Sequence, residues 1–197
     1  ARNHPHSMGK WSQSSRTHVA HMREGDFYHS DKSVVIEKTG SLRIELVSDN
    51  GDVTVLKEAV PVIEKEVVDG MFMSVAKLRT FLEEEMEGAK NAGLLFSLHL
   101  KATMMKISDP IIFGHAVTVY FKDAFEKHAK TFEELGVNPT TGLASVYEKI
   151  QDVTFSLHNE IEADLRACYE NRPETAMVDS DRGITNLHVP SDVIVDA

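Results

Sequence analysis

The hydrophobic periodicity of the chain changes near Met71, and this change limits the folds that the sequence can adopt. Over residues 33–68, short β-branched runs alternate with turn residues, and Asn50-Gly51 is among the strongest hairpin signals. We therefore expect a small antiparallel β meander over 33–68. Beyond Met71, apolar residues recur at helical spacing. Ser74 is the expected N-cap, and the predicted helix begins at Val75.

Helices and strands alternate over residues 71–197. The apolar spacing predicts four helices, over 75–89, 111–130, 142–153 and 158–171. It predicts three strands, over 94–100, 175–178 and 184–189. A β meander followed by alternating helices and strands is typical of an α/β fold, in which we expect a mixed sheet flanked by helices.

The composition excludes several classes of protein. The chain has 197 residues, of which 42% are apolar and 26% charged, as in a globular protein. Asp and Glu number 31 against 21 Lys and Arg, and the net charge of −10 argues against a nucleic-acid-binding surface. No apolar run approaches the ~18 residues that span a membrane. One cysteine, Cys168, excludes an internal disulfide and favours a reducing, cytoplasmic location.

Both ends of the sequence suggest that the chain is a fragment. It begins Ala-Arg-Asn rather than with Met, and no signal peptide is visible. It stops at Asp196-Ala197, directly after an apolar run. We therefore expect a longer native protein.

Lys101 is the most informative candidate for chemistry, because the common nucleotide-binding and nucleophile motifs are absent from the sequence. It lies on the polar face of the strand predicted over 94–100, with Ser97 and His99, as that strand ends. Ligands of open α/β sheets gather beyond the carboxyl ends of the strands. A lysine held near another cation has a lowered pKa and can act as a base. From the pattern alone, a solvated lysine is the commoner case.

Asp192 and Asp196 share one face whether their segment is a helix or a strand. Two neighbouring carboxylates suit Mg²⁺ or Mn²⁺, although ordinary exposed aspartates give the same pattern.

Ten histidines also suggest a metal site, but the pairs His4-x-His6 and His18-x-x-His21 are short, and no Cys-x-x-Cys accompanies them. We expect most of the histidines to be solvated or hydrogen-bonded.

Six blocks of sequence carry a family resemblance, namely residues 4–9, 16–22, 24–28, 98–106, 108–115 and 184–192. Among them are Leu98-His-Leu-Lys-Ala-Thr-Met-Met-Lys106 and Ser108-Asp-Pro-Ile-Ile-Phe-Gly-His115. Together the blocks resemble monomeric-type NADP-dependent isocitrate dehydrogenase. The resemblance implies that residues 1–197 are an internal piece of the large domain of a longer enzyme.

The resemblance also implies a reaction and two site residues. Isocitrate would be oxidised to oxalosuccinate as hydride passes to NADP⁺, and decarboxylation to 2-oxoglutarate would follow, with Mg²⁺ or Mn²⁺ stabilising the developing negative charge. Lys101 matches the catalytic lysine, and Asp196 matches the first metal-binding aspartate. The family's remaining ligands, including most NADP contacts, have no match here. The chain is therefore expected to be inactive alone and to need the rest of the same polypeptide for this step of the tricarboxylic acid cycle.

Two other interpretations remain open. The chain could be a non-catalytic acidic α/β interaction module, or a histidine-rich metal-binding protein. The native open reading frame would separate the first from the enzyme fragment. A long continuation past Ala197 favours the fragment, and a stop codon near Ala197 favours the interaction module.

Overall fold

The computed structural model describes residues 10, 12–100, 104–179, 184–185 and 187–188. By its internal contacts the chain divides into two compact units. Met22–Lys77 form one, here called the hairpin unit, and Ala1–His21 with Leu78–Ala197 form the other, the helical unit. The boundary lies close to the point where the periodicity of the sequence changes.

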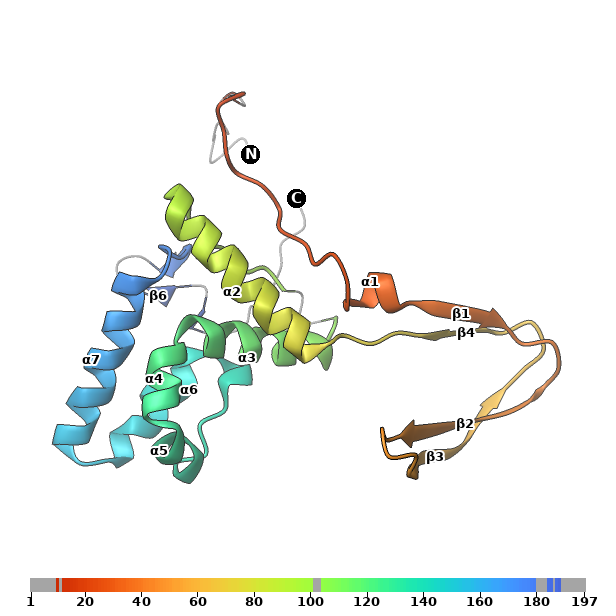
Figure 1. Cartoon of the computed structure of the whole chain (residues 1–197). Helices are drawn as coiled ribbons and strands as arrows, with labels where there is room; N and C mark the ends of the chain where they lie inside the picture. The colour runs from red at the N-terminus through yellow and green to blue at the C-terminus, as the bar shows by residue number, and fades with distance from the viewer. Residues whose placement is uncertain (1–9, 11, 101–103, 180–183, 186, 189–197) are drawn as a thin grey trace, which may run out of the picture. The chain divides into compact units, whose positions relative to one another are not determined.

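The hairpin unit contains a short helix and four strands: α1 (Phe27–Ser30), β1 (Lys32–Val35), β2 (Gly40–Val47), β3 (Val53–Val62) and β4 (Val67–Gly70). β2 pairs with β3 and β1 pairs with β4, both antiparallel, so the strands form a nested hairpin (Figure 1). The turn between β2 and β3 contains Gly51 at a φ of 87°, and the Gly51 N–H donates to the Ser48 carbonyl at 2.8 Å. The antiparallel strands expected over 33–68 are thus confirmed, but the meander is not, because β1 pairs with β4 rather than with β2.

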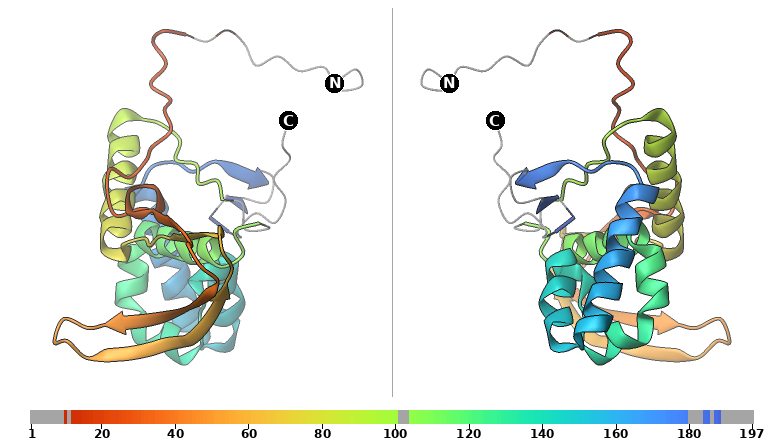
Figure 2. Two further views of the ribbon diagram at one scale, coloured as in Figure 1. Left: turned by 90° about the vertical axis from the view of Figure 1, so that its right-hand side faces the viewer. Right: turned by 90° about the vertical axis from the view of Figure 1, so that its left-hand side faces the viewer.

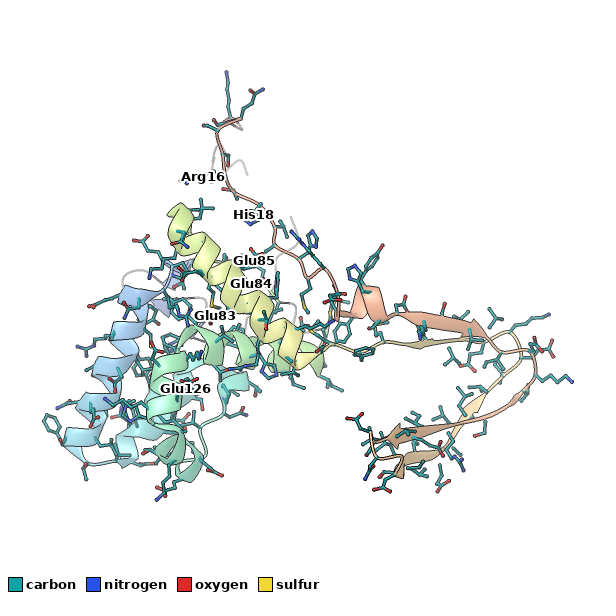
Figure 3. All side chains as sticks on the ribbon, viewed as in Figure 1. Arg16, His18, Glu83, Glu84, Glu85 and Glu126 are labelled. Carbon is teal, nitrogen blue, oxygen red and sulfur yellow. The ribbon has the colours of Figure 1, made fainter. Side chains whose placement is uncertain are left out.

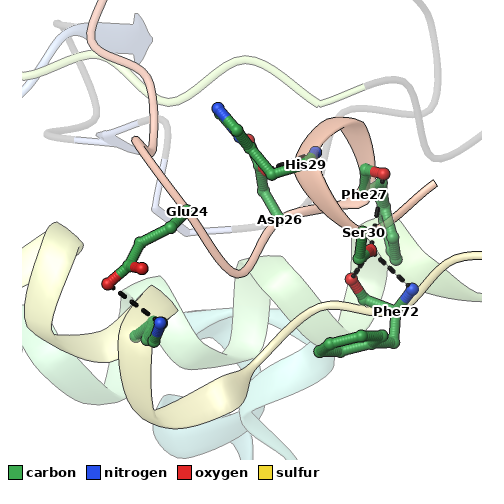
Figure 4. Close-up of polar contacts among 7 residues, drawn as sticks. Glu24, Asp26, Phe27, His29, Ser30 and Phe72 are labelled. Atoms are coloured by element: carbon green, nitrogen blue, oxygen red, sulfur yellow. Dashed lines mark hydrogen bonds and ion pairs between the residues drawn. The ribbon is translucent and has the colours of Figure 1, made fainter.

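Polar contacts hold together the two chain segments at the base of the hairpin (Figure 4). The Ser30 hydroxyl donates to the Phe72 carbonyl at 2.6 Å and accepts from the Phe72 N–H at 2.9 Å. Glu24 pairs with Lys77 at 2.9 Å. Gly25 has a φ of 73°, and a Cβ there would lie 2.6 Å from Lys77 Cδ, so both backbone conformation and space require glycine.

The helical unit contains most of the helices (Figure 2). Its α-helices are the greater part of α2 (Val75–Ala92), α3 (Ser108–Tyr120), α4 (Lys122–Lys127), α5 (Ala129–Glu134), α6 (Leu143–Lys149) and α7 (Phe155–Asn171). The shorter elements are the 3₁₀ turns η1 (Pro139–Thr141) and η2 (Ile150–Asp152) and the strands β5 (Met177–Asp179) and β6 (Ile184–Thr185). The helices expected near 75–89, 142–153 and 158–171 are therefore confirmed.

The single long helix expected over 111–130 is wrong, because the chain turns at two residues within it. Phe121 separates α3 from α4 with φ −100° and ψ 29°, and His128 separates α4 from α5 with φ −105° and ψ 18°. Both side chains are buried, and His128 is hydrogen-bonded to Asp164 of α7. Apolar spacing cannot distinguish one straight helix from shorter helices that each turn an apolar side to the core.

The core of the helical unit lies among α2, α3, α6 and α7. Its largest fully buried side chains are Tyr120, Phe113, Phe121, Met86, Leu143, Ile150, Ile161, Leu165, Leu187, Val117 and Val146. The rings of Tyr120, Phe121 and Tyr169 contact one another, and the Tyr120 hydroxyl donates to the Pro173 carbonyl at 2.7 Å. This bond satisfies the polar end of a side chain that is otherwise held in an apolar core.

The chain is an α/β mixture, as expected. In place of the mixed sheet expected, the described strands form three separate two-stranded antiparallel sheets, and Phe96 and Thr175 form one parallel bridge. No helix in the described part of the chain is long and apolar enough to cross a membrane.

Candidate functional site

Lys101 and Asp196, the two predicted site residues, lie outside the described residues, as does Asp192. The structure describes instead the two segments that lead to them. Residues 94–100 run up to Lys101, and residues 184–188, without residue 186, precede Asp196.

The segment before Lys101 is held at Phe96. The Phe96 N–H donates to the Glu174 carbonyl at 2.7 Å, and the Ala176 N–H donates to the Phe96 carbonyl at 3.0 Å. Both backbone groups of Phe96 are therefore fixed, although the strand expected over 94–100 is reduced to this one bridge. Beyond it, the Ser97 hydroxyl lies 2.7 Å from His99 Nε2, on the polar face that the alternation predicts.

The segment before Asp196 is held by the first turn of α6. The Leu143 N–H donates to the Leu187 carbonyl at 3.1 Å, and the Ala144 N–H donates to the His188 carbonyl at 2.9 Å. The first N–H groups of a helix have no partner within it, so these carbonyls satisfy them. Leu187 is fully buried, and the ring of His188 stacks on Tyr147 with centroids 6.1 Å apart.

Residues 174–179 adjoin both of these segments. Glu174 and Ala176 bond to Phe96, and β5 (Met177–Asp179) pairs with β6 in antiparallel register. The chain therefore brings together the segments that lead to Lys101 and Asp196, which are far apart in sequence.

Arg172 fixes the chain just before residues 174–179. Its guanidinium donates to both carboxylate oxygens of Glu83 on α2, at 2.8 and 3.2 Å, and to the Val119 carbonyl at 3.2 Å. The Arg172 side chain is only 12% exposed, which favours a strong bidentate pair.

A pocket of about 350 Å³ is lined by Lys90 and Arg172. Lys90 Nζ donates to the Asn171 carbonyl at 2.8 Å. Because both cations already bind oxygens of the chain, the pocket offers no ready anion site.

Three consecutive glutamates, Glu83, Glu84 and Glu85, lie on α2, and Glu84 is the exposed one (Figure 3). His18 Nε2 lies 3.6 Å from Glu85, and His18 Nδ1 lies 3.1 Å from the Arg16 carbonyl. That carbonyl and then Glu85 raise the pKa of His18 above its usual value. His18 thus contacts a carboxylate and a carbonyl, while His4 and His6 lie outside the described residues.

A cluster that the sequence analysis missed lies between the α4–α5 turn and α7. It consists of Lys127, His128, Glu160 and Asp164, and is called the His128 cluster below. His128 Nε2 lies 2.6 Å from Asp164, and Lys127 Nζ lies 2.8 Å from Asp164 and 2.9 Å from Glu160. Burial favours a higher pKa for Asp164, but hydrogen bonds from Lys127 and His128 outweigh it and lower that pKa. The i, i+4 spacing of Glu160 and Asp164 on the predicted helix was the available signal.

Comparisons with known proteins agree over the whole chain. The family profile described as monomeric isocitrate dehydrogenase matches residues 1–197. The chain is 59% identical to isocitrate dehydrogenase (NADP) 2 of Colwellia maris and 57% identical to that of Psychrobacter sp., over 197 residues in each case. It is 51% identical to isocitrate dehydrogenase (NADP) of Azotobacter vinelandii over the same length. All of the chain is covered, but only 26%, 27% and 27% of these relatives.

Proposed function

The chain belongs to the family of monomeric isocitrate dehydrogenases, and we propose that it is part of the large domain of an enzyme that converts isocitrate to 2-oxoglutarate with NADP⁺. The observation that carries this proposal is the family match over all 197 residues, with identities of 51–59% to NADP enzymes. The chain spans about a quarter of the length of these relatives. The rest of the same polypeptide would supply the missing ligands, so the chain alone would be inactive.

Lys101 is proposed as the residue that moves a proton during the reaction. Oxidation of a secondary alcohol requires loss of the hydroxyl proton as hydride leaves, and a lysine Nζ near a divalent cation is able to accept it. The fixed backbone of Phe96, five residues earlier, supports this role because a proton acceptor must be held at a constant position.

Asp196 is proposed as one ligand of Mg²⁺ or Mn²⁺. A carboxylate oxygen suits these hard cations, but they need several oxygen ligands, so Asp196 fits as a partial site only. A bound cation would stabilise negative charge on the substrate oxygens. The proposal is supported by the bonds from α6 to the carbonyls of Leu187 and His188, which fix the last described residues before Asp196.

The exposed apolar residues of the hairpin support a further partner, the rest of the same polypeptide. Ile44 and Leu46 of β2 and Val53 and Leu56 of β3 are all about half exposed or more. A two-stranded hairpin is marginally stable in water by itself, so such residues favour a covering surface. The acidic composition and the lone, buried Cys168 are consistent with our proposal of a cytoplasmic enzyme without a nucleic-acid partner.

The test of this function compares two lysines in the full-length enzyme. Lys101→Met is expected to lower kcat for isocitrate by ~10²–10⁴, the usual effect of losing a general acid or base. Lys106→Met, in the same block of sequence, serves as the matched control and should have far less effect. Equal, mild effects of the two substitutions on NADPH formation would contradict the assignment of Lys101.

The fragment itself provides a second test. The chain should form no NADPH from isocitrate, NADP⁺ and Mn²⁺. Turnover above background would refute the proposal that the chain lacks part of the active site. In a Mn²⁺ titration of the full-length enzyme, Asp196→Asn should raise the Mn²⁺ concentration required for activity, because an anionic ligand becomes neutral at constant size. An unchanged Mn²⁺ requirement would remove Asp196 from the metal site.

A further inference from the structure

The His128 cluster has the geometry of a cation site that is separate from Lys101 and Asp196. His128, Glu160 and Asp164 offer one imidazole nitrogen and two carboxylate oxygens, and these ligand atoms all lie within 4.8 Å of one another. His128 is only 5% exposed, so its ring is held in place by the surrounding helices. Among the described residues, this is the one group of three such ligands.

The chain already places a cation there. The ammonium of Lys127 lies within 2.9 Å of both Glu160 and Asp164, and these hydrogen bonds raise the pKa of Lys127 above its usual value. The carboxylates therefore face a position where positive charge is stabilised. Lys127 and Glu160 are each half exposed, so the ammonium can move into solvent and leave the carboxylates to another cation.

The ligand types indicate which metal would fit. Mg²⁺ and Ca²⁺ prefer six or more oxygen ligands, whereas Zn²⁺ binds nitrogen and carboxylate oxygen at about 2.0–2.2 Å in a tetrahedron. Three protein ligands and one water would complete such a tetrahedron. Its ligand atoms would lie roughly 3.4 Å apart. His128 Nε2 and Asp164 Oδ2, now 2.6 Å apart, must therefore separate by about 0.8 Å as bonds to the metal replace the hydrogen bond between them. The half-exposed Glu160 can adjust its position by a side-chain rotation.

We propose that the His128 cluster binds a divalent transition metal, with Zn²⁺ the best match, in competition with the ammonium of Lys127. The buried His128 provides the fixed ligand, and the more exposed Asp164 and Glu160 adjust around the ion. The bound ion would join the α4–α5 turn to α7. The site does not depend on the proposed dehydrogenase function, since it shares no residue with Lys101 or Asp196.

The experiment titrates Zn²⁺ into the 197-residue chain by calorimetry and uses Co²⁺ absorption to report the coordination geometry. The expected result is one Zn²⁺ per chain and an intense visible Co²⁺ spectrum typical of four ligands. Glu160→Gln should weaken binding by tenfold or more, as it removes an anionic ligand. Glu134→Gln, which alters an exposed carboxylate paired with Lys130, is the matched control and should bind as the unmodified chain does.

Lys127→Met gives the most specific outcome. A metal that competes with the ammonium should bind about five- to tenfold more tightly when that charge is removed. Equal Zn²⁺ affinity in the unmodified chain, Glu160→Gln and Lys127→Met would overturn the proposal, as would a weak six-coordinate Co²⁺ spectrum. Loss of binding in Asp196→Asn would also overturn it, by assigning the bound metal to the proposed catalytic site. Because Lys127 and Glu160 are half exposed, their substitution should leave the fold intact. Circular dichroism before each titration checks that the variants are folded.

Discussion

Gly114→Ala should destabilise the helical unit, although alanine is the better helix former. Gly114 lies inside α3, where the helix passes close to η1. A Cβ at this position would lie 3.1 Å from the backbone nitrogen of Thr140 and 3.2 Å from its Cα. Asn138 holds Thr140 in place, since its Oδ1 accepts from the Thr140 N–H at 3.1 Å and the Thr140 hydroxyl at 2.7 Å.

Two opposing effects set the magnitude. Replacing glycine by alanine in a helix interior stabilises it by about 1 kcal/mol. Forcing an extra methyl group into a packed contact costs roughly 1–3 kcal/mol when the neighbour cannot move away. The neighbour here is pinned backbone rather than the end of a flexible side chain. We therefore expect a net loss of about 1 kcal/mol in the free energy of unfolding, which lowers Tm by roughly 2–4 °C for a chain of this size.

Thermal unfolding followed by circular dichroism measures this difference, and Gly88→Ala is the matched control. Gly88 lies within α2 and is exposed, and a Cβ added there would meet no other atom within 4 Å. Gly88→Ala should therefore raise Tm by roughly 2–4 °C. If both substitutions raise Tm equally, the contact between α3 and η1 is looser than described and the reasoning fails.

Three further results are expected. Arg172→Met should lower the free energy of unfolding by about 2 kcal/mol, because a nearly buried arginine loses its bidentate bond to Glu83 and its bond to the Val119 carbonyl. Arg166→Met, at an exposed arginine, should cost under about 0.5 kcal/mol in urea unfolding. Burial raises the pKa of Tyr169 to about 12, above its unfolded value near 10, so stability should be complete below pH ~10 and fall as pH rises toward 12. Urea midpoints across this range check the fall, which Tyr169→Phe should reduce. Gly25→Ala should lower the stability of the hairpin unit, as measured by hydrogen exchange of β1 and β4, because it combines a positive φ with a clash. Unchanged exchange would contradict that contact.

Local signals in the sequence predicted the elements that are bounded by a recognisable turn or a helix-capping residue. Asn50-Gly51 predicted the hairpin turn, which the structure confirms, and Ser74 predicted the start of α2. The Lys77 N–H donates to the Ser74 hydroxyl at 3.4 Å, in the expected capping position. These features depend on a few adjacent residues, so a pattern within one segment is enough to reveal them.

Contacts between distant segments could not be predicted in this way. The turn at His128 depends on Asp164, and the position of Arg172 depends on Glu83, which is 89 residues away. Apolar spacing carries no information about such partners, which explains why three helices were expected to be one. Lys101 and Asp196 were identified through sequence blocks shared with a family, and their roles stay predictions because both lie outside the described residues.

The same distant contacts fix the described backbone near the candidate residues. Arg172 ties the beginning of residues 172–179 to α2 and α3, Phe96 binds the middle of that stretch, and β6 pairs with its end. The described backbone near Lys101 and up to His188 is therefore positioned by contacts within the chain itself. If the proposed function holds, ligands from the rest of the enzyme would meet this fixed backbone, which reduces the entropy lost when the complete site is ordered.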